Sequence, residues 1–181
     1  MTVYTIGHST RPLDDFLALL AAHRIEQLAD VRTVPRSRRH PQFAREALQA
    51  SLPAAGVAYR HFGGLGGLRK PRRDSLNSAW KNESFRGYAD YMQTAEFGGA
   101  LDELVAWAAP AGGSPGSAAP RTVVMCAEAV WWRCHRQLIA DALVAREIDV
   151  CHITSAAPPA THRLTSFARV DAGKVTYPGL L

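Results

Sequence analysis

The fold of this chain is most clearly indicated by Thr122-Val-Val-Met-Cys-Ala-Glu128, which is followed after a short gap by Cys134-His-Arg136. Thr122 to Met125 is almost entirely apolar, which is typical of a strand buried on both faces of a sheet. From Cys134 to Glu147 the apolar residues recur at helical spacing. A buried strand that runs into a helix is the repeating unit of α/β proteins, so this stretch predicts a parallel sheet covered by helices.

The same alternation of strands and helices continues along the rest of the chain. Apolar, β-rich runs predict five strands, at residues 3–6, 27–31, 57–62, 122–125 and 149–154. Helical spacing predicts helices at residues 13–20, 41–48, 85–108 and 134–147, the third of them bent or broken at Gly98-Gly99. Two short runs that flank Asp171-Ala-Gly173 predict a small hairpin.

These elements together predict an α/β fold with a single domain over residues 1–181. We expect a mostly parallel sheet of about five strands with helices on both faces, plus the small C-terminal hairpin. The Gly, Ser, Ala and Pro composition of residues 110–120 predicts a flexible loop without a chemical role.

The composition points to a globular protein in a reducing compartment. The 181 residues are 47% hydrophobic and 20% charged, and no apolar run approaches the length needed to cross a membrane. Met1 to Ser9 lacks the basic start and apolar centre of a signal peptide. Three cysteines are too few for a disulfide framework, so we expect reduced thiols and a cytoplasmic protein without a membrane partner.

The charge of the chain favours anionic partners. The formal net charge is +5 and the isoelectric point is about 9.4, which suits phosphate esters, nucleotides or nucleic acid. The basic residues fall into two groups, one of Arg32, Arg36, Arg38, Arg39 and Arg45, and one of Arg69, Lys70, Arg72 and Arg73. The first group directly follows a predicted buried strand, so part of it should face a site. For the second group a solvated surface is the simpler interpretation.

Polar or reactive side chains occur where each predicted strand ends. They are His8 and Ser9, Asp30 and Arg32, His61, Cys126 and Glu128, and His152. Right-handed crossovers place the carboxyl ends of parallel strands at one edge of the sheet, where ligands of such folds bind. The sequence therefore predicts a functional site at this edge.

Residue chemistry assigns provisional roles within that site. A thiol that faces a helix N-terminus beside arginines has a lowered pKa, so Cys126 is a candidate nucleophile, although a buried cysteine can also be a packing residue. The candidate catalytic residues are Cys126, Glu128, His8 and His61, and the candidate substrate-binding residues are Ser9, Asp30, Arg32, Arg36, Cys134, His135 and Arg136. For Cys134, as for Cys151, simple packing is the alternative.

The sequence predicts neither a metal nor a cofactor. Cys126, Glu128, Cys134 and His135 match no standard zinc spacing. Gly63-Gly-Leu-Gly-Gly67 matches neither the Walker pattern nor the dinucleotide-binding fingerprint, which favours a flexible loop.

Five sequence blocks together resemble a known family, the domain-of-unknown-function family 488. The blocks are Thr5-Ile-Gly-His-Ser9, Asp30-Val-Arg32 with Pro35 and Ser37-Arg38, Leu65-Gly-Gly67, Phe85-Arg-Gly-Tyr-Ala-Asp-Tyr-Met92, and Met125-Cys-Ala-Glu128 with Cys134-His-Arg136. The resemblance implies that these blocks belong to one α/β domain. It transfers no activity.

Three functions remain open at the level of the sequence. The first is an enzyme that acts on a phosphorylated or nucleotide-like anionic substrate, with Cys126 as nucleophile or Glu128 as general base. The alternative is a nucleic-acid-binding module without catalysis, which the basic groups and aromatic residues would serve. The third is a structural or regulatory protein that binds a protein partner of unknown identity.

Overall fold

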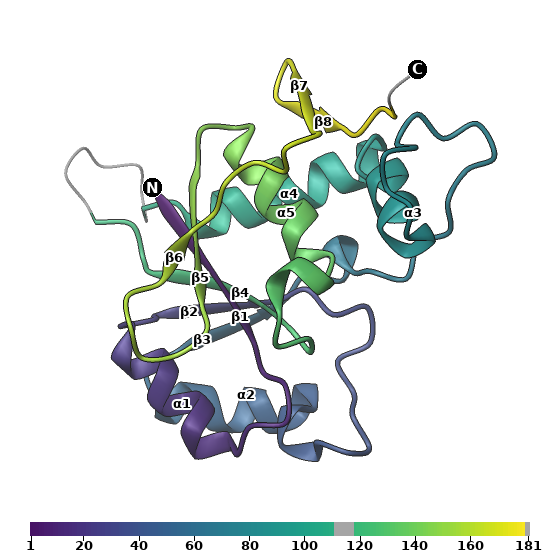
Figure 1. Ribbon diagram of the computed structural model, residues 1–181. Coiled ribbons are helices and arrows are strands. Elements are labelled where there is room, and N and C mark those ends of the chain that lie inside the picture. Colours follow the sequence, from purple (N-terminus) through teal and green to yellow (C-terminus); the bar gives the residue numbers. More distant parts are fainter. Residues whose placement is uncertain (111–117, 180–181) are drawn as a thin grey trace.

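A six-stranded sheet forms the centre of the computed structural model, which describes residues 1–110 and 118–179 (Figure 1). The strands are β1 (Thr2–Gly7), β2 (Gln27–Asp30), β3 (Ala58–His61), β4 (Thr122–Cys126), β5 (Asp149–Ile153) and β6 (Ala160–Thr161), in the order β3-β2-β4-β1-β5-β6. Neighbours among β1 to β5 are parallel, and β6 is antiparallel to β5. The predicted α/β fold with a mostly parallel sheet is confirmed. The short sixth strand has too few residues to show a sequence pattern.

Helices cover both faces of this sheet, as predicted (Figure 1). The helix α1 (Leu13–Ala22) and the helix α2 (Arg45–Ala54) pack on one face, where Phe16 and Leu52 meet Ile6. On the other face lie α3 (Glu83–Tyr91), α4 (Ala95–Ala108) and α5 (Arg136–Val144). Tyr88 and Leu138 belong to the apolar core of that face.

The long predicted helix at residues 85–108 is two helices, and the break differs from the predicted one. It falls between Tyr91 and Ala95, and the Thr94 side chain accepts a hydrogen bond from the Phe97 amide at the start of α4. Gly98 and Gly99 lie inside α4. A side-chain cap stabilises a helix start by about 1 kcal/mol, whereas glycine inside a helix costs a similar amount without ending it.

The remaining predicted features are the hairpin, the loop and the absence of a membrane span. The hairpin is confirmed as β7 (Arg169–Asp171) and β8 (Lys174–Thr176), and Ala172 and Gly173 between them both have positive φ angles, as a type I′ turn requires. Most of the predicted loop at residues 110–120 lies outside the described residues, which resume at residue 118. Within the described ranges, no helix is long and apolar enough to cross a membrane.

The strand order places a crevice at the carboxyl end of β4. This strand lies between β2 and β1, which lead into α2 and α1 on one face of the sheet, whereas β4 leads into α5 on the other face. Ligands of open α/β sheets bind where the connections leave neighbouring strands in opposite directions. Cys126, the last residue of β4, is therefore at the position that the topology favours for a ligand.

Candidate functional site

A cleft of about 660 Å³ opens at the carboxyl ends of β1, β2 and β4. Eight of the predicted site residues line it: His8, Ser9, Arg32, Arg36, Cys126, Glu128, Cys134 and His135. The other three, Asp30, His61 and Arg136, do not line it and instead support residues that do. The cleft has the volume of a site for a small organic ligand.

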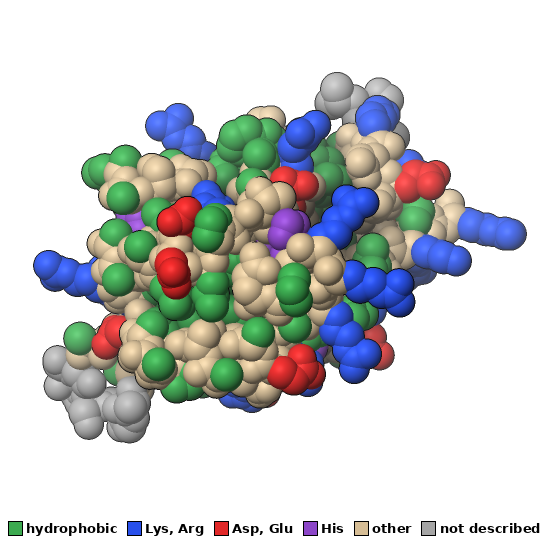
Figure 2. Space-filling view, turned by 90° about the horizontal axis from the view of Figure 1, so that it is seen from below, with side chains coloured by type: hydrophobic (Ala, Val, Ile, Leu, Met, Phe, Trp, Pro, Cys, Tyr) green, Lys and Arg blue, Asp and Glu red, His purple; other side chains and the backbone are tan. Residues whose placement is uncertain are grey.

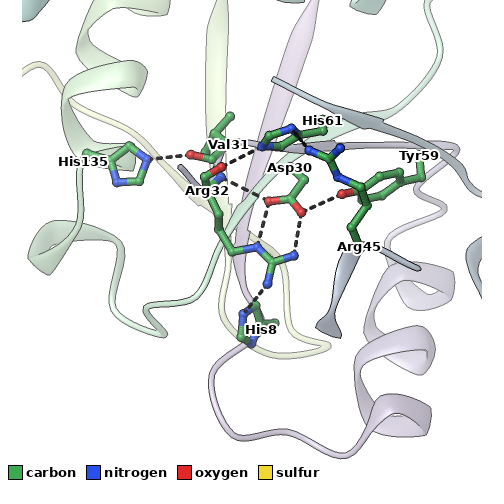
Figure 3. Close-up of polar contacts among 8 residues, drawn as sticks. All are labelled: His8, Asp30, Val31, Arg32, Arg45, Tyr59, His61 and His135. Atoms are coloured by element: carbon green, nitrogen blue, oxygen red, sulfur yellow. Dashed lines mark hydrogen bonds and ion pairs between the residues drawn. The ribbon is translucent and has the colours of Figure 1, made fainter. Parts of the chain in front are cut away.

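Asp30 lies beneath the cleft and fixes the guanidinium of Arg32 (Figure 3). Nε of Arg32 donates to Oδ1 of Asp30 at 2.8 Å, and the second nitrogen donates to Oδ2 at 2.6 Å. The hydroxyl of Tyr59 donates to the same carboxylate at 2.8 Å, and this contact together with burial raises the pKa of Tyr59. Asp30 thus uses its acceptor positions on the protein and offers none to a substrate.

His8 is an uncharged acceptor on the wall of the cleft. Its Nδ1 donates to the Ser9 carbonyl at 2.9 Å, which leaves Nε2 to accept from Arg32 at 3.3 Å (Figure 3). The ring stacks on Phe43 with 4.2 Å between the centroids. Burial, together with the charge of Arg32, lowers the pKa of His8 to about 4, so the imidazole is neutral near pH 7.

His61 supports the loop after β2 from outside the cleft (Figure 3). Arg45 donates to its Nδ1, so Nε2 carries the proton and donates to the Arg32 carbonyl at 2.8 Å. Both ring nitrogens are therefore engaged with the protein. In this geometry His61 holds the backbone of Arg32, and no nitrogen of its ring is free to exchange a proton with a substrate.

Two cysteines are in contact at the centre of the cleft. Sγ of Cys126 and Sγ of Cys134 are 2.7 Å apart, and the two side chains are 2% and 8% exposed. His135 Nδ1 lies 3.4 Å from Sγ of Cys134, while its Nε2 donates to the Val31 carbonyl at 3.1 Å (Figure 3 shows the second contact). The sequence had placed these residues at the same edge, but it did not predict the contact between the sulfurs.

The contact between the two thiols shifts their pKa values in opposite directions. The hydrogen bond from Cys126 lowers the pKa of Cys134 well below the ordinary value, and His135 and Arg136 lower it further against the opposing effect of burial. Burial and the negative charge of Cys134 raise the pKa of Cys126 well above the ordinary value. The directions of the two shifts favour ionisation of Cys134 over ionisation of Cys126.

Arg136 lies behind the cysteines and not in the cleft. Its side chain is 1% exposed, and its guanidinium donates to the backbone carbonyls of Glu128 and Ala129. Its positive charge helps to lower the pKa of Cys134 and opposes the rise in the pKa of Cys126. Arg136 thus favours an anion in the site through its charge, while the exposed Arg133 lines the cleft itself.

The loop after Cys126 has its carbonyl groups turned into the protein. The Cys126 and Ala127 carbonyls accept from the His8 and Ser9 amides, each at 3.0 Å, and the Glu128 carbonyl accepts from Arg136. In a trans peptide the carbonyl and the following N–H point in opposite directions. The N–H groups of Ala127, Glu128 and Ala129 are therefore directed away from β1 and Arg136, and all three residues line the cleft.

Gly7 makes this arrangement of the loop possible. A Cβ atom at this position would lie 1.9 Å from the Glu128 carbonyl oxygen and 2.8 Å from the Ala129 Cα. These are backbone atoms, so no rotation of a side chain could relieve the overlap. The end of β1 and the loop after β4 pack at a distance that only glycine permits.

Comparison with known proteins places the chain in a family. The profile described as Domain of unknown function DUF488 matches residues 12–143. The chain belongs to the DUF488 family. No curated protein and no solved structure matches it. The matched range includes the loop after β2, the cysteine pair and most of α5, so the DUF488 profile covers much of the cleft.

The rim of the cleft in this DUF488 protein combines apolar and basic side chains. Val34 and Leu68 are 60% and 88% exposed, and Arg36 and Arg133 lie exposed along the same opening. Figure 2 shows Lys and Arg side chains gathered most densely on its right, the side to which the loop between β2 and α2 projects in Figure 1.

Several lining residues of the DUF488 cleft were not among the predicted site residues. They are Thr10, Thr33, Val34, Ser37, His40, Gly67, Leu68, Ser84, Phe85, Tyr88, Ala127, Ala129 and Arg133. Tyr88 was expected only as a helix residue, but its hydroxyl donates to the Leu65 carbonyl at 2.7 Å and its ring lies 5.1 Å from that of His135. Some of these positions lie within the recognised blocks, namely Ser37, Gly67, Phe85, Tyr88 and Ala127, and that was the available signal for them. Among the described residues, no group of three or more His, Cys, Asp and Glu side chains is arranged to hold a metal ion.

Proposed function

We propose that this DUF488 protein is an enzyme that acts on a small phosphorylated or nucleotide-like anion, with the thiolate of Cys134 as the reacting group. The observation that carries the proposal is the contact between Cys126 and Cys134 inside a cleft with arginines on its wall and rim. A buried cation and an adjacent imidazole would not stabilise a pair of neutral thiols whose only role is packing. For a nucleophilic cysteine, both groups lower the pKa of the thiol and so favour the reactive thiolate.

The assignment of the nucleophile to Cys134 instead of Cys126 follows from the directions of the two pKa shifts. The contact with Cys126 lowers the pKa of Cys134, and the His135 ring, which lies on the Cys134 side of the pair, lowers it further. Glu128 is exposed at the cleft and is suited to transfer a proton to or from a substrate. His8 is neutral near pH 7 and serves as an acceptor that orients Arg32.

Binding of the anion rests on cations and on backbone amides. Asp30 partly neutralises Arg32, so Arg36 and Arg133 contribute most of the uncompensated charge at the cleft. The N–H groups of residues 127–129 supply directional donors, which suit the oxygen atoms of a phosphate or carboxylate. A thiolate of this kind requires a reducing compartment, which agrees with the expected cytoplasmic location.

Alkylation of the thiols tests this proposal. Cys151 is half-buried, so the measurement uses the Cys151→Ser variant, with Cys126→Ser and Cys134→Ser added singly as matched controls. We expect iodoacetamide to modify Cys134 rapidly near pH 7 and inorganic phosphate to slow the reaction. Peptide mass spectrometry identifies the modified residue. Modification of Cys134 no faster than in the urea-unfolded chain would refute the thiolate.

A nucleic-acid-binding module is the second candidate, and the exposed basic residues around the cleft favour it. Arg38, Arg39, Lys70 and Arg73 are exposed on loops that follow the lining residues. Contacts to backbone phosphates make affinity fall steeply with salt. Binding of single-stranded oligonucleotides measured between low and physiological salt distinguishes this candidate, because an enzyme for a small anion needs no such binding.

A further inference from the structure

We infer that Cys126 and Cys134 alternate between a dithiol and a disulfide during turnover, and that the substrate is a small anionic molecule with a disulfide bond. This inference rests on the proposed Cys134 nucleophile and names the bond on which it acts. Cys126 becomes a second catalytic residue, which attacks Cys134 after the substrate has been bound covalently.

The positions of the two sulfur atoms carry the argument. They lie 2.7 Å apart, whereas the sulfur atoms of a disulfide are separated by about 2.05 Å. Cys126 ends β4, and Cys134 lies two residues before α5, so the fold brings together two residues from different segments of the chain. A shift of less than about 1 Å in either side chain closes the bond, and a nucleophile for the second step is in place before the substrate arrives.

The charges around the pair favour the two steps in this order. Cys126 keeps its proton as long as Cys134 is a thiolate, because the negative charge on Cys134 and burial both raise the pKa of Cys126. Once Cys134 has formed a bond to the substrate, that negative charge is gone. The positive charge of Arg136 then favours ionisation of Cys126. The thiolate that the substrate released in the first step is a base that can accept the proton.

The reaction balances as two successive thiol–disulfide exchanges. In the first, the Cys134 thiolate attacks one sulfur of the substrate, a bond forms between these two atoms, and the other half of the substrate leaves as a thiolate with the bonding electron pair. In the second, the Cys126 thiolate attacks Sγ of Cys134 and expels the remaining half as a thiolate. The substrate is reduced to two thiols, and the protein is oxidised to the disulfide. A low-molecular-weight thiol or a dithiol protein then reduces the protein by the same exchange.

The dimensions and charge of the cleft define the class of disulfide. A volume of about 660 Å³ suits an organic molecule of moderate size and exceeds what a peroxide needs. Arg36 and Arg133 at the opening favour carboxylates or phosphates, while the exposed Val34 and Leu68 provide apolar contact for the body of the molecule.

The aromatic disulfide 5,5′-dithiobis(2-nitrobenzoate) is a suitable probe, because it carries two carboxylates and releases a coloured thiolate. With reduced Cys151→Ser protein, we expect two equivalents of the coloured thiolate to be released and none to be retained. Peptide mapping should then show the Cys126–Cys134 disulfide. With Cys126→Ser or Cys126→Ala added, one equivalent should be released and one should stay bound to Cys134. The uncharged 4,4′-dithiodipyridine, corrected for its intrinsic reactivity, should react about tenfold more slowly.

The outcomes separate this inference from the proposed function. If Cys134 is alkylated rapidly but the protein with both cysteines retains the probe as a stable mixed disulfide, the dithiol cycle is wrong and the thiolate stands. If alkylation of Cys134 is slow but the Cys126–Cys134 disulfide still forms completely, the thiolate is wrong and the dithiol cycle is supported. Equal corrected rates for the charged and uncharged probes would overturn the anionic substrate class.

Discussion

Two clusters of polar side chains in this protein contain similar residues but differ in access and in the freedom of their protons. The first is the cleft cluster of Arg32, Cys126, Cys134 and His135. The second is a sealed network of Thr5, Asp141, His152, His162 and Tyr177, in which every member is at most 5% exposed. Both lie where strands and α5 meet, so their location in the fold does not distinguish them.

The sealed network has one arrangement of its protons. The Asp141 carboxylate accepts from His162 Nε2 at 2.9 Å, so His162 Nδ1 accepts from His152 Nε2 at 2.9 Å, and His152 Nδ1 accepts from the Thr5 hydroxyl at 2.7 Å. Tyr177 donates to the second oxygen of the carboxylate at 2.7 Å. Each proton has a donor and an acceptor inside the network, so nothing remains for a ligand.

The cleft cluster differs because its two thiols differ in pKa and both line an open cleft. The comparison teaches that histidine, carboxylate and hydroxyl groups at strand ends are not sufficient for a reactive site. Reactivity needs an acceptor position that the protein leaves open and a path for the substrate to reach it.

Removing the carboxylate from the sealed network should have the largest effect on stability. Asp141→Asn replaces an ionised acceptor on which two buried side chains and the Thr165 amide converge. We expect the free energy of unfolding in urea to fall by ~3 kcal/mol. The exposed Asp149 provides the matched control, since Asp149→Asn should change stability by less than ~0.5 kcal/mol. Equal effects of the two substitutions would contradict a structural role for the network.

Acid should destabilise the protein through one histidine from each cluster. Burial lowers the pKa of His152 to about 3 and that of His8 to about 4, from an ordinary value of 6.5. Between pH 6.5 and 5 the unfolded chain binds these protons and the folded protein does not, so stability is lost as the pH falls. Each histidine should contribute about 1.4 kcal/mol per pH unit at the lower end of this range.

Urea unfolding at several pH values from 7.5 to 5 measures this slope. His152→Gln and His8→Gln should each reduce the slope, whatever their effect on stability at pH 7.5. An unchanged slope in either variant would show that the corresponding histidine is protonated in the folded protein. If both variants reduce the slope, burial keeps the histidine uncharged in both clusters. This would hold even though only the cleft cluster is accessible to a ligand.

Neutralising a cation at the rim should have the smallest effect and should act on the cleft alone. Arg36→Ala should weaken protection of Cys134 by phosphate a few-fold and leave the unfolding midpoint in urea unchanged within error, because an exposed charge contributes under ~1 kcal/mol. Arg169→Ala, on the exposed β7 strand, is the control and should alter neither quantity. A loss of stability in Arg36→Ala without a loss of protection would place Arg36 outside the anion site.

The sheet, the helices on both faces and the edge that carries the site could be predicted because each depends on local patterns. The apolar run of β4 and the helical spacing of α5 identify their own secondary structure, and right-handed connections then determine the edge. Cys126, Glu128 and His8 followed from their positions directly after apolar strands. No knowledge of long-range contacts was needed for these steps.

The distinction between residues in the cleft and residues beneath it could not be predicted in the same way. Asp30 and Arg32 are two positions apart, yet only Arg32 lines the cleft, because Asp30 is covered by Tyr59 of the neighbouring strand. Arg136 follows the lining residue His135 but turns inward to the loop carbonyls. His162 has the local sequence of a surface loop and is buried only because Asp141 of α5 accepts its proton. Each case depends on a partner far away in the sequence.

The way in which the loop after Cys126 is held has a consequence for the entropy of ligand binding. Fixing one residue of backbone costs about 1–2 kcal/mol of conformational free energy. Here the amides of His8 and Ser9, just after β1, and the guanidinium of Arg136 already fix the loop, and the close packing at Gly7 permits little displacement. The ordering of residues 127–129 is therefore complete when the protein folds. A ligand that binds to their N–H groups meets donors that do not need to be ordered again, so more of its interaction energy appears as affinity.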